Sequence, residues 1–184
     1  MNYRLLHMIN SLAGHSWLLD DLMVFVAKYL VYVVFVVLAL VGLPFLRRRD
    51  WQPLFAAGSG LVLAFALGLL ATTVYFEPRP FTTHPGLHVL TPHDPGKSFP
   101  SDHATAAFAI SFVLLAFLSR RWGLVVLGCA LLIGFARVYD GIHYPGDIAG
   151  SAVIAALGVG AVSAALAALA RRHPQDTALP SVRP

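Results

Sequence analysis

Five long apolar runs constrain the fold of this chain more than any other feature. They cover about residues 22–46, 54–75, 101–118, 122–137 and 147–169, and short polar or basic stretches separate them. About 20 apolar residues are enough to cross the hydrocarbon core of a bilayer as a helix. Lipid offers no partner for backbone N–H and C=O groups, so a span of this kind has to be helical. The sequence therefore predicts an all-α integral membrane protein.

The composition agrees with this class. Hydrophobic residues make up 58% of the chain and charged residues 12%, whereas soluble domains average about 45–50% and about 25%. The net charge is +4, but the basic residues form short clusters between apolar runs and no continuous patch. That distribution is typical of membrane topology signals, so we expect a lipid bilayer around the chain and no nucleic-acid partner.

Residues 3–16 are too polar to form a further span. One helical face of this segment carries Arg4, His7, Ser11 and His15, and the other face is largely apolar. We interpret it as an amphipathic helix at the membrane interface, with a short, weakly hydrophobic first span as the alternative. The predicted fold is thus a six-helix bundle with one N-terminal amphipathic or short helix and five transmembrane helices. No signal peptide is expected, because no basic cluster leads into an apolar core with a cleavage site.

The arginine clusters predict the orientation of the chain. Clusters at 47–49, 120–121 and 171–172 fall on one side of a five-span protein. Because positively charged loops favour the cytoplasm, we expect that side to be inside. The loops 76–100 and 137–147 then face outward, on the side that holds seven of the eight histidines and seven of the nine acidic residues. We predict a multi-pass protein of the inner (plasma) membrane whose chemistry lies at the outer face.

The chain divides into one membrane-embedded domain and a tail. At this length a single domain is expected, and we place it at residues 1–172. Residues 173–184 are polar and contain three prolines. This composition predicts a disordered tail, on the cytoplasmic side.

The segment Gly134–Asp147 holds the strongest candidates for chemistry. It lies where one apolar run ends and the next begins. Arg137 is followed six residues later by His143, and His143 four residues later by Asp147. An arginine is a permanent cation whose planar fork suits phosphate oxygens. A histidine with a carboxylate partner keeps one ring nitrogen protonated and the other free to act as a nucleophile or base.

Two further clusters fall on the same side of the membrane. Arg79 follows the second apolar run, and residues 100–103 open the third. In the latter, Ser101 is a good N-cap, and the free amides of a helix start form an anion site that His103 can reach from the first turn. Two arginines, a helix N-terminus and two histidines predict a phosphoryl group held by cations and transferred through histidine.

These three clusters resemble a known signature. Arg79-Pro80, Pro100-Ser101-Asp102-His103 and Arg137-x5-His143-x3-Asp147 are similar to the three motifs of the type-2 phosphatidic acid phosphatase superfamily. Its members are membrane-embedded lipid phosphatases with six helices. Within the superfamily, the motifs are most similar to those of the bacterial undecaprenyl-diphosphate phosphatases of the BcrC type. The resemblance extends over roughly residues 2–170.

The resemblance implies a role for each motif residue. It makes His143 the nucleophile that becomes phosphohistidine, with Asp147 holding the other ring nitrogen. It makes His103 the general acid that protonates the leaving group and then the base that activates water. The phosphate oxygens are expected to be bound by Arg79, Ser101 and Arg137.

The implied reaction is hydrolysis of undecaprenyl diphosphate to undecaprenyl phosphate and inorganic phosphate. It would recycle the lipid carrier of cell-wall synthesis and give tolerance to bacitracin. The alternative phospholipid phosphate substrates are phosphatidylglycerol phosphate, phosphatidic acid and diacylglycerol diphosphate. A non-enzymatic alternative is a proton relay or anion-binding membrane protein. A relay needs ionisable groups through the depth of the membrane, and the inner halves of these spans have none.

The sequence departs from the family pattern at three positions. Thr72 stands where the wider family has a lysine, and we consider Lys97 its replacement, with Lys28 as the next candidate. Asp102 replaces a usual glycine and is a further phosphate-site candidate, which could hydrogen-bond a cation or stay protonated. Ala136 replaces a serine that would donate to phosphate.

A metal site is not expected. His84, His88 and His93 share one loop, but their spacing is loose, which favours exposed loop histidines over zinc ligands. The sequence also lacks the carboxylate cluster that usually holds Mg²⁺. We therefore predict metal-independent chemistry without a cofactor.

Overall fold

The computed structural model describes residues 2–172 and is helical throughout this range apart from its connecting loops. The elements are α1 (Asn2–Asn10), α2 (Trp17–Arg47), α3 (Trp51–Val74), α4 (Pro80–Thr83), α5 (Asp102–Val113), a π-helical turn (Leu114–Leu118), α6 (Arg120–Tyr139) and α7 (Pro145–Arg172). The tail predicted at 173–184 lies outside the described residues.

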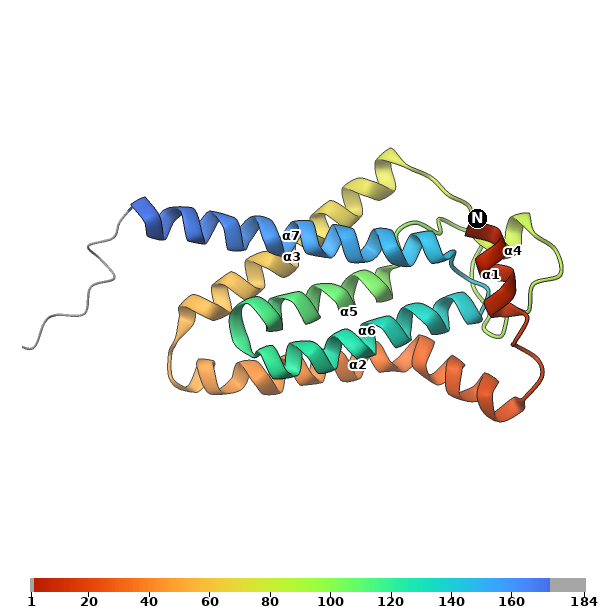
Figure 1. Ribbon diagram of the computed structural model, residues 1–184, viewed down its shortest axis with the longest axis horizontal. Coiled ribbons are helices and arrows are strands. Elements are labelled where there is room, and N and C mark those ends of the chain that lie inside the picture. Colours follow the sequence, from red (N-terminus) through yellow and green to blue (C-terminus); the bar gives the residue numbers. More distant parts are fainter. Residues whose placement is uncertain (1, 173–184) are drawn as a thin grey trace, which may run out of the picture.

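Helix α5 forms the centre of the bundle. It packs against α2, α3, α6 and α7, and nearly all of its side chains are buried. Small residues dominate it, which lets four neighbouring helices approach closely. The long helices lie side by side along the molecule in Figure 1. The first turn of α5 is therefore held in the middle of one end of the bundle.

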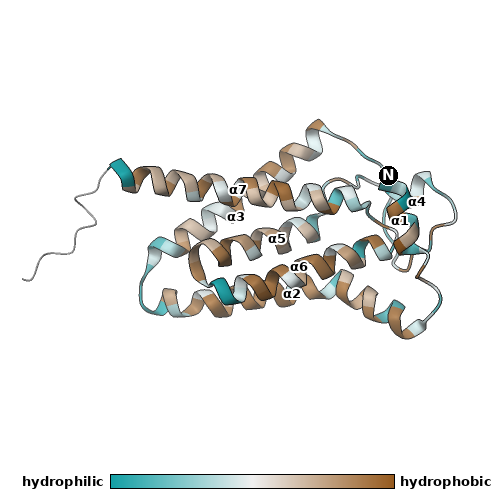
Figure 2. Cartoon of the chain, in the orientation of Figure 1, coloured by the Kyte–Doolittle hydropathy of each residue, from teal (hydrophilic) through white to brown (hydrophobic). Residues whose placement is uncertain are grey.

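The outer surface of the bundle is apolar along its length. Large side chains such as Phe55, Val62 and Leu69 on α3 are exposed, and Figure 2 shows hydrophobic residues along the long helices with polar ones gathered towards the ends. Within the described residues, α2, α3, α6 and α7 are long and apolar enough to cross a membrane, and 102–118 forms a shorter apolar segment. The predicted all-α membrane class is confirmed.

The predicted number of helices was wrong by one. The described residues form seven α-helices where six were expected. The additional helix is α4, a single four-residue turn that begins at Pro80 in the loop after α3. Proline at the first helical position is favourable because its fixed φ suits the helix and it lacks the N–H that would be unpaired there. This local preference inside a proline-rich loop is not visible in hydrophobic periodicity.

The N-terminal segment does not span a membrane. Helix α1 has nine residues, about 14 Å at 1.5 Å per residue, whereas a hydrocarbon core is about 30 Å thick. It lies across one end of the bundle (Figure 1). Its Leu6 is fully buried in a cluster with Val138 and Tyr144, while Leu5 and Met8 are exposed. The helix is thus attached to the ends of α6 and α7.

The two ends of the bundle differ in charge. The arginines at 47–49, 120–121 and 171–172 lie where α2 ends, α6 begins and α7 ends, and Figure 1 places these helix termini at the same end. The loop after α3, the α6–α7 connection and α1 lie at the opposite end. The arrangement of arginine clusters predicted from sequence is therefore present in the fold.

Helices α3 and α7 approach each other closely at Gly158. A Cβ atom built there would lie 2.6 Å from both the backbone nitrogen and Cα of Ala64. Real side chains do not occupy such positions, so we predict that Gly158→Ala separates α3 from α7 and destabilises the protein by about 1–3 kcal/mol. The measurement is the thermal unfolding midpoint in detergent.

Gly160 provides the matched control on the same helix. A Cβ at Gly160 would meet no atom of the described residues within 4 Å. Because alanine favours a helix over glycine, Gly160→Ala should leave the midpoint unchanged or raise it. Equal midpoints for the two variants would contradict the proposed contact.

Candidate active site

His143 lies in the short connection between α6 and α7, at the end of the bundle opposite the arginine clusters. Its side chain is 2% exposed. The connection turns sharply at Gly141, whose φ is +72°. A Cβ there would lie 2.9 Å from the carbonyl oxygen of His88. Both the left-handed backbone conformation and this close contact disfavour a side chain, so glycine is needed at position 141.

The Nδ1 side of His143 faces a buried carboxylate. Nδ1 lies 3.4 Å from Oδ2 of Asp147 and 3.4 Å from Oγ of Ser98. The same Asp147 oxygen accepts hydrogen bonds from the Ser98 hydroxyl and, at 2.8 Å, from the backbone N–H of Tyr144. Asp147 is fully buried, and all three contacts are made by Oδ2, since Oδ1 has no hydrogen-bond partner in the described residues. This arrangement favours the His143 tautomer with a proton on Nδ1.

The Nε2 side of His143 faces two guanidinium groups. Nη2 of Arg137 lies 3.2 Å from Nε2, and Nη1 of Arg79 lies 3.5 Å from it. Arginine nitrogens can only donate, so Nε2 presents its lone pair to them. Arg79 also donates to the carbonyl of Ile142 at 3.2 Å, and Arg137 donates to that of Ala27 at 3.5 Å. Nε2 of His143 and both guanidinium groups therefore meet at the same point of the site.

Burial lowers the pKa of His143, the positive charge of Arg137 lowers it further, and Asp147 opposes both effects. A lowered pKa means that the ring is neutral at pH values where an exposed histidine would be protonated. A neutral ring with Nδ1–H towards Asp147 keeps the Nε2 lone pair available for nucleophilic attack.

The start of α5 supplies further donors. Ser101 is its N-cap residue, and its backbone N–H donates to Oγ of Ser151 at 3.0 Å. Ser151 in turn donates to the carbonyl of Asp147 at 2.7 Å, so α5 and α7 are tied together beside the site. Oγ of Ser101 and Nε of both Arg79 and Arg137 are buried without a hydrogen-bond partner in the described residues. Unpaired buried donors are costly, and an anion would satisfy them.

The first two motifs are joined by backbone pairing. Pro78 and Lys97 form an antiparallel bridge, the N–H of Arg79 donates to the carbonyl of Gly96 at 3.2 Å, and that of Ser98 donates to Glu77 at 2.7 Å. This pairing brings Arg79 to the approach of α5.

Lys97 and Thr72 line the same cavity. The cavity has a volume of about 270 Å³ and is lined by Phe65, Gly68, Leu69, Thr72, Lys97, Pro100, Asp102 and Thr105. Lys97 is therefore near the position from which the family lysine would extend, whereas Lys28 does not line this cavity. This geometry is consistent with Lys97 replacing the lysine that the wider family has at position 72.

Asp102 and His103 both occupy the first turn of α5, and His103 is half-buried while Asp102 is exposed. Burial lowers the pKa of Arg79, and the negative charges of Asp102, Asp147 and Asp94 oppose this effect. Asp102 therefore lies within electrostatic range of Arg79. Of the two roles considered from sequence, this position favours interaction with a cation.

Sequence reasoning missed the contacts that hold the His143 connection in place. Asn10, buried at the end of α1, donates from Nδ2 to the carbonyls of His88 at 2.7 Å and Tyr139 at 2.8 Å, and its Oδ1 accepts from the N–H of His88 at 2.9 Å. Asn2 accepts from the N–H of Gly146 at 2.9 Å. In the sequence, Asn2 and Asn10 are simply polar residues at the two ends of an amphipathic helix, so nothing indicated that they hold the His143 connection.

Asp140 follows α6 directly before Gly141, and its carboxylate holds the loop after α3. It is fully buried and accepts from the backbone N–H groups of Leu90 and Thr91 at 2.9 Å each. It also accepts from the Thr91 hydroxyl. The loop after α3 is thus fixed to the end of α6.

The three loop histidines have separate surroundings. The ring of His84 lies 4.0 Å from that of Tyr3, centroid to centroid. His93 contacts Thr91, and the ring of His88 lies beside Gly14. Within residues 2–172, no group of three histidine, cysteine or acidic side chains is placed to hold a metal ion.

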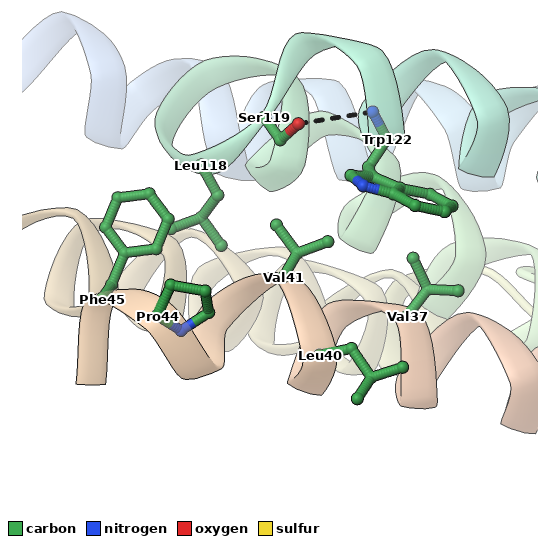
Figure 3. A pocket seen from close by; sticks show the side chains of 8 residues that line it. All are labelled: Val37, Leu40, Val41, Pro44, Phe45, Leu118, Ser119 and Trp122. Carbon is green, nitrogen blue, oxygen red and sulfur yellow. Dashed lines mark hydrogen bonds between the residues drawn. The ribbon is translucent and has the colours of Figure 1, made fainter. Parts of the chain in front are cut away.

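A larger apolar cavity lies away from these residues. It has a volume of about 370 Å³ and is lined by Val37, Leu40, Val41, Pro44, Phe45, Leu118, Ser119 and Trp122. Figure 3 shows it between α2 and the turn that joins α5 to α6, which is the arginine-bearing end of the bundle. Its lining offers no ionisable side chain, so it is not a candidate for the chemistry.

Together these features define a class: a helical membrane protein that holds a buried histidine between a carboxylate and two arginines at one end of the bundle. The chain belongs to the PAP2 superfamily, whose family model matches residues 53–171. This confirms the resemblance drawn from the three motifs.

Individual relatives agree with this assignment. The chain is 41% identical over 157 residues to "Undecaprenyl-diphosphatase BcrC" of Bacillus subtilis, covering 84% of this chain and 79% of the relative. It is 29% identical to "Bacitracin transport permease protein BcrC" of Bacillus licheniformis, covering 85% and 76%. Among solved structures, LpxE of Aquifex aeolicus superposes with a TM-score of 0.71 at 25% identity, covering 88% of this chain and 93% of that chain.

We predict that Asn10→Ala loosens the connection that carries His143. The change removes three hydrogen bonds and leaves the carbonyls of His88 and Tyr139 without that donor, which should cost about 1–3 kcal/mol of stability. Hydrogen–deuterium exchange of residues 139–144 should increase. Ser11→Ala is the control, because Ser11 bonds only to Met8 within its own segment. Unchanged exchange in Asn10→Ala would show that α1 does not fix the connection.

Proposed function

We propose that this protein is a membrane lipid phosphatase that hydrolyses undecaprenyl diphosphate to undecaprenyl phosphate and inorganic phosphate. The observation that carries the proposal is the two-sided setting of His143, with Asp147 at Nδ1 and two arginines at Nε2. The relatives named undecaprenyl-diphosphatase and bacitracin permease support the choice of substrate.

In the first step, Nε2 of His143 attacks the terminal phosphorus. A P–N bond forms, and the bond between this phosphorus and the bridging oxygen breaks, which releases undecaprenyl phosphate. His103 donates a proton to the departing oxygen. Asp147 stabilises the positive charge that develops on the imidazole, and Arg79, Arg137 and the donors near Ser101 stabilise the phosphoryl oxygens.

In the second step, water attacks the phosphohistidine. His103, left unprotonated by the first step, removes a proton from the water. The P–N bond breaks, inorganic phosphate leaves, and His143 returns to its neutral form. Lys97 and Asp102 border the site, with Lys97 adding positive charge and Asp102 interacting with Arg79. No metal ion or other cofactor takes part in this scheme.

The charge distribution supports an outer-face location for the reaction. With the arginine clusters in the cytoplasm, the site opens on the outer face of the plasma membrane. There the enzyme would recycle the lipid carrier released by cell-wall polymer transfer. It would also compete with bacitracin for the diphosphate, so that a high level of the protein would confer tolerance.

We predict that His143→Ala abolishes phosphate release from undecaprenyl diphosphate, with a loss of more than about a thousandfold. The assay compares undecaprenyl diphosphate with phosphatidic acid, each with and without excess EDTA. Wild-type protein should prefer the diphosphate and should be unaffected by EDTA. His15→Ala serves as the control, because His15 is exposed and lies outside the site.

Each other outcome would change a different part of the proposal. Activity that survives in His143→Ala would exclude the phosphohistidine. Equal or faster hydrolysis of phosphatidic acid would retain the mechanism and remove the cell-wall role. Inhibition by EDTA would assign a metal to the loop histidines, and no hydrolysis of any lipid phosphate would favour an anion-binding protein.

The orientation can be measured with single cysteines. Cys129 is the one native cysteine, so the variants Asp94→Cys and Gln52→Cys are made in a Cys129→Ser background. Both positions are exposed, one beside each end of the bundle. A membrane-impermeant maleimide should label Asp94→Cys in intact cells and Gln52→Cys only after permeabilisation. The reverse pattern would place the site in the cytoplasm.

A further inference from the structure

The segment from Thr91 to Gly96 runs between two fixed points beside the candidate active site. At one end, Thr91 is bonded to Asp140 through its backbone N–H and its hydroxyl. At the other end, the carbonyl of Gly96 accepts from the N–H of Arg79. Asp140 follows Arg137 by three residues. His93, midway along this segment, therefore lies near the two arginines of the site, within electrostatic range of both.

The hydrogen bonds of His93 define its orientation. Its Nδ1 lies 3.2 Å from Oγ1 of Thr91 and 3.4 Å from the Thr91 carbonyl oxygen. The carbonyl can only accept, and the Thr91 hydroxyl already donates its proton to Asp140. Nδ1 must therefore carry the proton. The other ring nitrogen, Nε2, is left free for a ligand.

The proposed nucleophile, His143, is held by a similar combination of a hydroxyl and a buried carboxylate. There a buried aspartate, Asp147, accepts from the hydroxyl of Ser98, which lies 3.4 Å from Nδ1 of His143. At His93 the corresponding groups are Asp140 and Thr91. A buried carboxylate and a hydroxyl thus orient two histidines of one site, although His93 was predicted from sequence to be an ordinary exposed loop residue.

The charges around His93 indicate what its Nε2 can bind. Burial lowers the pKa of His93, and the positive charges of Arg137 and Arg79 lower it further, while the Thr91 carbonyl and Asp140 oppose this. Two further charges lie close by in the chain: Asp94 next to His93, and Lys97 directly after the segment. The free ring is neutral. An anion that neutralises the two arginines removes the main electrostatic obstacle to protonation, and the protonated ring can then donate from Nε2.

We propose that His93 binds the second, lipid-bound phosphate of a diphosphate substrate through Nε2–H and thereby selects diphosphates over monophosphates. This inference rests on the proposed function. Arg79, Arg137 and the start of α5 supply donors for the terminal phosphate. A diphosphate places additional negative charge next to that phosphate and needs further donors, and His93 lies within electrostatic range of the same two arginines.

The test uses inorganic ligands, so it does not depend on turnover. In a His143→Ala background, binding of pyrophosphate and of phosphate is measured by calorimetry with and without His93→Gln. The expected result is a loss of pyrophosphate affinity of about 10- to 100-fold, the range for a hydrogen bond to a charged group. Phosphate affinity should change by less than about threefold on the same reasoning.

Three matched variants separate the role of the ring from a general effect of substitution. His88→Gln replaces an exposed histidine of the same loop and should leave both affinities unchanged. Thr91→Val removes the hydroxyl beside Nδ1 and should weaken pyrophosphate binding selectively, whereas Thr91→Ser keeps the hydroxyl and should restore it. In otherwise wild-type protein, His93→Gln should lower kcat/KM for undecaprenyl diphosphate by the same 10- to 100-fold.

The inference is overturned if His93→Gln weakens both ligands equally, if it weakens neither, or if the His143→Ala protein shows no preference for pyrophosphate. The proposed function has a separate test, since it fails if the wild-type protein releases no phosphate from a lipid diphosphate. A protein that fails the turnover assay but loses pyrophosphate selectivity in His93→Gln would still contain the second phosphate site.

Discussion

The burial of charge around His143 is the constraint on which the rest of this structure depends. Arg137 is 4% exposed, His143 2% and Asp147 0%. Removing such groups from water costs several kcal/mol per ion unless charges and hydrogen bonds compensate. Asp147 is compensated at Oδ2 by Ser98 and the Tyr144 amide, whereas its Oδ1 lacks a partner in the described residues. The two arginines are only partly compensated, since Nε of each lacks a partner in the described residues. The protein therefore keeps two incompletely satisfied guanidinium groups at one place, and this is the physical basis on which we propose that it binds a phosphate.

Such a site requires rigid surroundings, and the fold supplies them from distant parts of the sequence. The connection between α6 and α7 is held by Asn10 from the N-terminus, and Asp140 at the end of α6 holds the loop after α3. Ser151 joins α5 to α7 beside Asp147. Each tie is a buried hydrogen bond, which costs free energy if it is broken without a replacement. The short helix α1 thus contributes directly to holding the connection that carries His143.

Much of the fold could be predicted because it depends on hydrophobic length and charge position. The five apolar runs and the grouping of the arginine clusters at one end were both readable from sequence. The site motifs were also recognisable, because Arg137, His143 and Asp147 are close in the chain. The roles of Asn10, Ser98, Thr91 and Ser151 were not, because each depends on a partner at least 45 residues away. The turn α4 was missed because it is too short for any periodicity.

Lys97, which we propose as the replacement for the family lysine, differs from position 72 in what fixes its backbone. A lysine at position 72 would extend from α3, a helix that contacts lipid. Lys97 instead belongs to the strand-like pair with Pro78, so its backbone is fixed to the segment that carries Arg79. The cavity that Lys97 and Thr72 share also includes Asp102 and Thr105 from α5. Lys97 is therefore linked to the motif that contains Arg79 through its backbone pairing and to the start of α5 through the shared cavity. A shift of either segment would move Lys97 as well. In the proposed site, the position of this cation depends on the backbone pairing of residues 77–79 with 96–98 more than on the packing of α3.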